Sequence, residues 1–468
     1  MAIVRWLYLL SLLSTQALAV DVFATANGHA GQAAYDSDGS ALPCHFGAVS
    51  QPLLLAEAIE RSLCYDPQTR LAWASAKAQA AMAGVNQAAY LPRLDGQLGS
   101  STGQRAVDYD EAQYDSSEGR LRRDNANLQL SWVLFDFGQR EAALSQARQL
   151  LLAANANQDR VLQEAFLRAA SAYYQALAAQ RSVQASTQIA EMAGQNLEAA
   201  DAKYKAGAAA LSDRLQAQTA FSQASLQQVR DQGALTAALG VLALRMGLAA
   251  QTPLQLGSEL SQVGGREFVQ AVDKLLAQAR QQHPALLAAQ ARVKAAEAGV
   301  EQVRAAGMPT IALTGELGWQ RNRQGQELAG DYQSRERSIG LQVSLPLFEG
   351  FSRNYQIRNA QALLEASQAE VAQTEEEVAL QLWANYQQLS VETQSLERTQ
   401  QLVEQSQQAL EVVQGRYRSG VGSMIEMLNG LTAYTAAQQQ HIQSLSSWQT
   451  SRLGLAASLG RLGFWTLD

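Results

Sequence analysis

The chain has 468 residues, a formal net charge of −7, and only 17% charged residues. Lysine supplies 5 of the 36 basic residues, so we expect no basic surface for nucleic acid. Four histidines and two cysteines leave little material for a metal centre or a nucleophile–base pair, and no phosphate-loop or dinucleotide glycine pattern occurs. We therefore expect no cofactor, no bound metal and no enzymatic activity. The chain is rich in Ala, Leu and Gln and has only eight prolines, which favours long helices.

Residues 1–19 have the pattern of a signal peptide. Arg5 supplies a positive charge, Trp6–Leu13 form a short apolar run, and Ala17 and Ala19 make a small-x-small cleavage site. The run is too short to span a bilayer as a helix, and no later segment offers ~18 consecutive apolar residues. Cleavage would leave Val20 first, with no cysteine there to be lipid-modified. The mature chain is predicted to be exported without a transmembrane helix.

Residues 20–50 show no periodicity and are predicted to be a flexible N-terminal segment. Cys44 and Cys64 are the two cysteines of the chain, and export to an oxidising compartment favours a disulfide between them. Two unpaired thiols are the alternative. A Cys44–Cys64 disulfide would attach the segment to the first helix.

Helical segments and prolines then occur twice at the same spacing. A helix is expected over Leu53–Cys64, and Asp66 with Pro67 begins a second one that ends before Pro92. In the second half Pro284 and Pro309 repeat the same separation of 25 residues. This agreement predicts two structural repeats, one over residues 51–248 and one over 266–464, with a linker at 249–265.

After each proline pair the apolar residues alternate with polar or small ones, which predicts β-hairpins at about 93–136 and 310–347. Thr102–Asp124 and Gln320–Arg337 are expected to be their long polar loops. The strand length and alternation are those of an outer-membrane barrel, although a soluble two-sheet sandwich would give a similar pattern. Because four strands cannot close a barrel and an open edge is costly in lipid, we expect three chains to contribute twelve strands.

Two very long helices without an internal proline follow, over Gly138–Gly207 and Phe351–Gly420. Their apolar residues recur at spacings of four and three, which favours coiled-coil packing. The residues of this pattern are Leu162, Phe166, Ala169, Tyr173 and Ala176 in the first helix, and Ala379, Leu382, Tyr386 and Leu389 in the second. Return helices are expected from Ser212 to about Arg245 and from Ser423 to about Gly460.

The turns between these helices share one motif, in which basic-Tyr-basic-x-Gly is followed by an acid and a Leu. It occurs at Lys203–Leu215 and again at Arg416–Leu428, 213 residues apart. Each Gly can end a helix, and each acid, Asp213 or Glu426, can be a favourable charge in the first turn of the next helix. This plain interpretation of the motif stays open beside a functional one.

The ordered set of these motifs resembles the TolC-like outer membrane channel family, the exit ducts of efflux pumps and type I secretion systems. The resemblance covers the chain from Leu53 to about Phe464. It rests on the duplicated helix–Pro–strand junctions, on the two Tyr-x-x-Gly turns, and on Leu134–Gly138 and Leu347–Gly350, where strand becomes helix.

The resemblance implies a mainly α fold with a membrane β part. Three chains would form a twelve-stranded barrel in the cell outer membrane, and the barrel would continue into a periplasmic α-helical coiled-coil tunnel. It also implies the partners, which are two further copies of the chain, a periplasmic adaptor protein, an inner-membrane ABC or proton-driven transporter, and outer membrane lipid.

The same resemblance assigns roles to the two turns at the periplasmic end of the tunnel. The adaptor would dock on the turns formed by Lys203, Tyr204, Gly207 and Ala208 and by Arg416, Tyr417, Gly420, Val421 and Gly422, with both tyrosines packing beneath their turns. The periplasmic gate would include Asp213 and Glu426, together with Asn429, where many members of the family carry a second acid. Arg416 and Arg418 are candidate bases for contacts that hold the gate shut.

The cargo of such a duct is left open between protein, in type I secretion, and small molecules, in efflux. The Cys44-bearing extension and the absence of a lipidated N-terminus favour protein secretion. Three other classes of protein would show different features. A periplasmic adaptor would need domains rich in short strands, an exported coiled-coil scaffold would not need the alternating strands, and a secreted enzyme would need a catalytic constellation.

Overall fold

The computed structural model describes residues 21–28, 44, 46–107, 117–257, 272–324 and 331–463. The predicted signal peptide, and residues 258–265 of the predicted linker, lie outside the described residues. No described helix is both long enough and apolar enough to cross a membrane.

The described helices and strands form the same series twice along the chain. After a short 3₁₀ helix, η1 (Thr25–Gly28), the first series is α2 (Leu55–Tyr65), α3 (Pro67–Ala88), β1 (Arg93–Val107), β2 (Ser117–Phe135), α4 (Gln139–Lys205) and α5 (Leu211–Arg245). The second is α6 (Val272–Gln282), α7 (Pro284–Ala305), β3 (Thr310–Gln324), β4 (Tyr332–Ser344), α8 (Ser352–Arg418) and α9 (Met424–Ser458). Corresponding helices have equal lengths of 11, 22, 67 and 35 residues. The predicted order of elements is confirmed.

The described residues form two compact units, and each unit takes residues from both halves of the sequence. The first contains Lys77–Ala153 and Gln290–Glu370, and with them the four strands. The second contains Ala154–Ala289 and Val371–Asp468, and with them most of α4 and α8 and all of α5 and α9.

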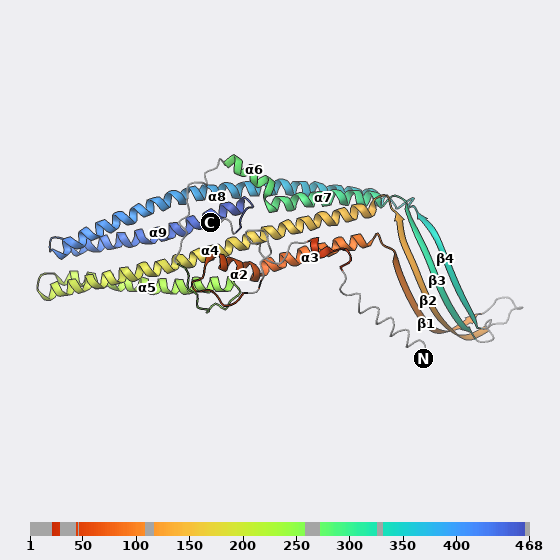
Figure 1. The fold of residues 1–468 in the computed structure, drawn as a ribbon, viewed down its shortest axis with the longest axis horizontal. Coiled ribbons are helices and arrows are strands. Elements are labelled where there is room, and N and C mark those ends of the chain that lie inside the picture. Colours follow the sequence, from red (N-terminus) through yellow and green to blue (C-terminus); the bar gives the residue numbers. More distant parts are fainter. Residues whose placement is uncertain are drawn as a thin grey trace. The chain divides into compact units, whose positions relative to one another are not determined.

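The first unit is built on one antiparallel sheet with the strand order β1-β2-β3-β4 (Figure 1). The register places Leu94 opposite Leu130, Leu128 opposite Leu317, and Leu313 opposite Leu341. Since side chains alternate between the faces of a strand, these residues share one apolar face. Leu94, Leu128, Leu317 and Leu341 on that face are exposed in the single chain. An uncovered apolar face of this kind suits lipid rather than water.

The strands are longer than the sequence predicted, and both predicted loops were too long at each end. Thr102–Val107 and Ser117–Asp124 belong to β1 and β2, and much of Gln320–Arg337 belongs to β3 and β4. The pairing continues because the ladder is made by backbone N–H and C=O groups, so it does not need the apolar alternation that marks the other part of the strands. Polar side chains even support it, as where the Ser100 hydroxyl donates to Asp124 Oδ1 at 2.7 Å.

Each strand-to-helix junction is held by an acid and an arginine four residues apart. Arg140 Nε lies 2.8 Å from Asp136 Oδ2, and the Arg140 guanidinium also donates to the carbonyl of Val133 at 2.8 Å. In the second repeat Arg353 Nη2 lies 2.9 Å from Glu349 Oε2. The intervening pairs, Phe137–Gly138 and Gly350–Phe351, have positive φ, so the two strand-to-helix junctions use left-handed backbone at equivalent places.

The second unit has an apolar core in which the long helices pack on the shorter ones. The predicted apolar pattern of α4 is buried in this core: Leu162, Phe166, Ala169, Tyr173 and Ala176 are all less than 9% exposed. The Tyr173 hydroxyl donates to the Leu53 carbonyl at 3.0 Å, and Leu53 forms a parallel bridge with Leu256. In α8, Leu382 is fully buried, and Tyr386 and Leu389 pack against the cluster that contains it.

Part of the predicted flexible segment has definite contacts. Arg61 Nη2 donates to the carbonyls of Gly47 and Ala48, each at 3.0 Å, and Glu57 accepts from the backbone N–H of Ser50. The predicted flexible segment, 20–50, thus includes residues at 46–50 that side chains of α2 contact. The sequence did not indicate these contacts, because the segment has no periodic pattern of its own.

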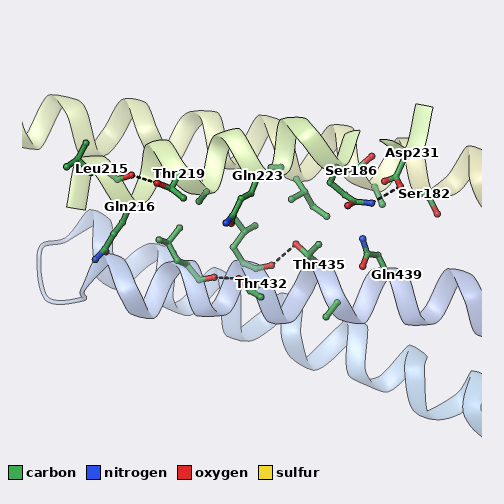
Figure 2. A pocket seen from close by; sticks show the side chains of 18 residues that line it. Ser182, Ser186, Leu215, Gln216, Thr219, Gln223, Asp231, Thr432, Thr435 and Gln439 are labelled. Atoms are coloured by element: carbon green, nitrogen blue, oxygen red, sulfur yellow. Dashed lines mark hydrogen bonds between the residues drawn. The ribbon is translucent and has the colours of Figure 1, made fainter. Parts of the chain in front are cut away.

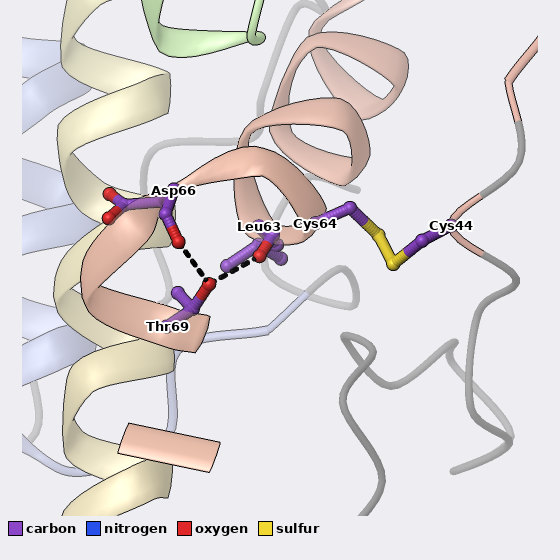
Figure 3. The surroundings of a disulfide bond; sticks show 5 residues. All are labelled: Cys44, Leu63, Cys64, Asp66 and Thr69. Carbon is purple, nitrogen blue, oxygen red and sulfur yellow. Dashed lines mark hydrogen bonds between the residues drawn. A yellow bond between two sulfur atoms is a disulfide. The ribbon is translucent and has the colours of Figure 1, made fainter. Parts of the chain in front are cut away.

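The structure joins Cys44 and Cys64 in a disulfide at the end of α2 (Figure 3). Beside it, the Thr69 hydroxyl donates to the carbonyls of Leu63 and Asp66 at 2.7 and 2.8 Å. The Asp66 carboxylate accepts from the Gln68 N–H at 2.7 Å, which is the cap expected at the start of α3. The predicted start of α2 at Leu53 was early, since the helix begins at Leu55 while Leu53 pairs with the chain near Leu256.

Candidate functional site

The two turns at the ends of the long helices have the same backbone hydrogen bonds. In the first, the Ala208 N–H donates to the Lys203 carbonyl at 2.8 Å and the Gly207 N–H to the Tyr204 carbonyl at 3.0 Å. In the second, Val421 donates to Arg416 at 3.1 Å and Gly420 to Tyr417 at 3.2 Å.

This is the Schellman pattern, in which a left-handed residue follows the last helical turn. Gly207 has φ +71° and Gly420 has φ +82°, so both positions favour glycine. Gly422 is favoured for another reason, because a Cβ there would lie only 3.0 Å from the Cβ of Arg416 and from the backbone nitrogen of Tyr417. Gly207 and Gly420 therefore do end their helices, as the simpler interpretation of the motif predicts.

The two hairpins meet at these turns around Tyr417. Its side chain is 4% exposed and packs in a cluster with Ala200 and Ala217 of the first hairpin and Met424 and Met427 of the second. Burial, and after it the charge of Asp213, raises the pKa of the Tyr417 phenol. Tyr417 therefore packs beneath its turn, whereas Tyr204 is only partly buried.

Lys203 joins the first turn to the second. Its Nζ donates to the Tyr417 carbonyl and lies 4.0 Å from the centroid of the Tyr417 ring. A cation over an aromatic face is attracted by the ring quadrupole, and a charged donor strengthens the bond to the carbonyl. This contact, hereafter the tip clasp, links two residues 214 positions apart in sequence.

The three predicted gate residues lie at the start of the return helices. Asp213 is in the first turn of α5, and Glu426 is in the first turn of α9. The Glu426 N–H donates to the Ser423 hydroxyl at 3.2 Å, and its carboxylate lies 3.7 Å from Arg416 Nη2. Asn429 follows within α9 and is exposed. Arg416 thus contacts the acid for which it was a candidate, and Arg418 forms no ion pair with the residues described.

Two residues that the sequence analysis did not single out complete the first turn. Asp201 lies 2.6 Å from Lys205 Nζ and 3.0 Å from Arg214 Nε, and the hydrogen bond from Lys205 is the largest of the effects that lower the pKa of the Asp201 carboxyl. Arg214 also lies over the Tyr204 ring, 5.6 Å from its centroid. The four-residue spacing of Asp201 and Lys205 was a usable signal, whereas the contact with Arg214 needs the folded hairpin.

A groove of about 660 Å³ lies between the two hairpins beyond the turns (Figure 2). Helices α4, α5 and α9 line it with amide and hydroxyl side chains and also with apolar ones, among them Ile189 and Leu431. The labelled polar residues include Gln216, Gln223 and Gln439. In the part of the chain that the structure describes, no group of histidine, cysteine and acidic residues could hold a metal ion.

Known proteins with similar sequences or folds agree on one family. The profile of the family described as "Outer membrane efflux protein" matches residues 58–248 and 275–461. Protein CyaE of Bordetella pertussis is 33% identical over 89% of this chain and 86% of its own. The alkaline protease secretion protein AprF of Pseudomonas aeruginosa is 23% identical over 80% of this chain and 78% of its own.

Among solved structures, the outer membrane protein VceC of Vibrio cholerae matches with a TM-score of 0.71. It is 21% identical and covers 88% of this chain and 96% of its own. At that identity it supports the fold alone, which is the mainly helical, duplicated fold with one four-stranded sheet. The profile match and the resemblance to CyaE show that the chain belongs to the outer membrane efflux protein family, whose members are transport channels of the outer membrane and not enzymes.

Proposed function

We propose that three copies of this chain form the exit duct of a tripartite export machine and that its cargo is protein. The duct would receive cargo from an inner-membrane transporter through a periplasmic adaptor and release it outside the cell. The observation that carries this proposal is the sheet. Among the residues that the structure describes, its apolar face is exposed and each of its two outer strands pairs along one side only.

The sheet requires partners in a membrane. Among the described residues, β1 and β4 each pair along one side only. An unpaired backbone edge in lipid costs several kcal/mol per group, so the edges of one copy must meet those of another. Three copies of a four-stranded sheet give twelve strands, enough to close around a lumen.

The helices of the second unit support ring closure independently, because equivalent positions of the two repeats differ in burial. Ile189 on α4 is 6% exposed, whereas its equivalent on α8, Leu402, is 42% exposed. On the return helices, Ile442 of α9 is 8% exposed and the equivalent Val229 of α5 is 69% exposed.

This difference has a simple explanation in a ring of alternating repeats. Within one chain, α4 meets α9: the Ser446 hydroxyl donates to the Tyr174 carbonyl at 3.4 Å, and Ile189 and Leu431 share one apolar cluster. In the ring, α8 is the equivalent of α4, and α5 of the next copy is the equivalent of α9. The same contact, repeated around the ring, therefore places α8 of one copy against α5 of the next. Both of those helices carry exposed apolar residues, including Leu402 and Val229, as a contact between copies would need.

The experiment is cysteine cross-linking guided by this repeat shift. The pair Ile189 and Leu431 corresponds to Leu402 of one copy and Gln218 of the next. The double variant Leu402→Cys/Gln218→Cys, treated with a short bifunctional maleimide in membranes, should give covalent trimers on a denaturing gel. The native cysteines do not interfere because they are paired in a disulfide.

Each single variant is the control and should stay monomeric on the gel. Cross-linking that stops at dimers, or a conducting detergent-extracted particle with the mass of one or two chains, would overturn the trimer.

The tips of the hairpins are the proposed entrance of the duct. Gly207 and Ala208, with Gly420, Val421 and Gly422, present tight turns on which an adaptor would dock. Asp213 and Glu426 would bring up to six acids near one axis in three copies. The tip clasp, which ties the two hairpins together, supports a closed resting arrangement of this entrance.

Protein cargo is favoured by the resemblance to AprF, whose name assigns it to protease secretion. Small-molecule efflux is the second candidate, favoured by the description of the family itself. Deleting the gene separates the two: loss of a secreted protein from the medium with unchanged drug susceptibility supports the first. Increased drug susceptibility with unchanged secretion supports the second.

A further inference from the structure

Six arginines lie on the apolar face of the sheet, just beyond its apolar part. They form what we call the arginine belt: Arg120 and Arg122 on β2, Arg321 and Arg323 on β3, and Arg335 and Arg337 on β4. The register places Leu317 opposite both Leu128 and Arg337, and all six arginines are an even number of residues from the apolar positions of their strands. The belt therefore shares the face of Leu128, Leu317 and Leu341, and all six side chains are exposed.

Among the described residues, the positive charge of the belt is compensated only in part, by Asp124, which lies beside Arg122 and opposite Arg321. Arg122 Nε lies 3.5 Å from Asp124 Oδ1, an acid that also accepts from Ser100. For the other five arginines, no carboxylate of the described residues lies within the 4.0 Å of an ion pair. Arg122 and Arg323 are directly opposite each other on adjacent strands. Like charges so placed destabilise a sheet, so an external anion between them would be stabilising.

The belt lies at the end of the strands away from the helices. Helix α4 begins four residues after β2 ends at Phe135, and α8 begins after β4 ends at Ser344. Arg122 and Arg335 lie toward the opposite ends of those strands. In the proposed duct, on which this inference rests, the helices are periplasmic, so the belt faces the outer leaflet.

We infer that the arginine belt binds the phosphate-bearing headgroups of outer-leaflet lipids. Adjacent strands are ~4.8 Å apart, so neighbouring guanidinium groups can share one phosphate, and each can bind it with two parallel N–H donors. The lipid tails would cover the adjoining apolar part of the same face. Because the arginine belt directly adjoins the apolar part of the same face, one lipid can contact both. This points to a lipid and not to free phosphate.

A matched control is available on the other face of the sheet. Arg123 lies between belt positions in sequence but points to the opposite face, where its Nε donates to Asn322 Oδ1 at 3.3 Å. Arg123→Gln therefore removes the same charge from the same strand without touching the belt.

The experiment measures lipid binding to the intact trimer. Wild type, Arg321→Gln/Arg323→Gln, the single variant Arg335→Gln and Arg123→Gln are placed in phosphatidylcholine nanodiscs. Lipid A is titrated in with its phosphates present or enzymatically removed, and retained lipid is counted by native mass spectrometry. Inorganic phosphate in solution is a competing arm.

We expect wild type to prefer the phosphorylated lipid, and the affinity to fall roughly fivefold for each belt arginine removed. Arg123→Gln should bind as wild type does, and inorganic phosphate should compete weakly. Equal binding of phosphorylated and dephosphorylated lipid by wild type would overturn the inference, as would equal losses in Arg335→Gln and Arg123→Gln. Full competition by inorganic phosphate would also overturn it, because the site would then be one for the free ion.

Conductance in planar bilayers separates this inference from the proposed function. Conducting trimers that show no lipid preference refute the belt alone. Particles that do not conduct refute the duct, whatever lipid they retain.

Discussion

The tip clasp predicts that Lys203→Gln opens the entrance of the duct. The substitution keeps most of the side-chain stem but removes the cation from above the Tyr417 ring and from its carbonyl. A cation–π contact contributes ~0.5–2 kcal/mol, and a hydrogen bond to a charged group contributes ~1.5–3 kcal/mol. Because the two share one ammonium and do not add, we expect a loss of about 2 kcal/mol, which is roughly a thirtyfold shift.

Single-channel recording in planar bilayers measures this shift as time spent in a state of higher conductance. The matched control is Lys205→Gln, which removes the same charge two residues away. Lys205 pairs with Asp201 of its own hairpin, so the control should leave the opening equilibrium near that of wild type. Tyr417→Leu removes the ring but keeps the backbone carbonyl, so it should open the entrance less than Lys203→Gln does. Adding Tyr417→Leu to Lys203→Gln should have little further effect, because the ammonium that makes both contacts is already absent. Equal behaviour of Lys203→Gln and Lys205→Gln would refute the clasp as a closing contact.

Three further outcomes are expected. Glu426→Ala should lower cation selectivity and block by divalent cations in single-channel recordings, because each copy loses a negative charge near the pore axis. Asn429→Asp should raise both, because each copy gains one. If neither variant changes selectivity or block, Glu426 is only a helix-start residue. Burial raises the pKa of the Asp159 carboxyl to about 6, above its ordinary value of 3.8. The stability that this group contributes is therefore fully present below pH 3.8 and is lost as the pH rises through 6. Asp159→Asn should therefore raise the free energy of unfolding at pH 8 by up to ~3 kcal/mol, seen as a higher melting temperature, and should hardly change either quantity at pH 4. Equal shifts at both pH values would contradict this. Alkylation without reductant should label neither Cys44 nor Cys64 in exported protein, whereas labelling of both would exclude their disulfide.

The duplication and the order of elements could be predicted because their signals are local. Pro67 begins a helix, Gly207 and Gly420 end helices, and the alternation around Leu128 marks a strand, whatever the rest of the chain does. Because these signals recur in the second half of the chain with matching spacing, the two copies together indicate the lengths of the elements. The strand ends could not be predicted in this way, because backbone pairing past Asp124 needs a partner strand and not a side-chain pattern.

Sequence alone determined which residues can turn, pair or pack, and it made the two repeats equivalent. Only the tertiary structure decided that equivalent residues have different surroundings. Ile189 is buried and Leu402 is exposed because one faces the other hairpin of its own chain and the other does not. The same holds for Lys203, whose partner Tyr417 lies in the other repeat. Burial and charge pairing are set by residues distant in sequence, so no local pattern could have placed them.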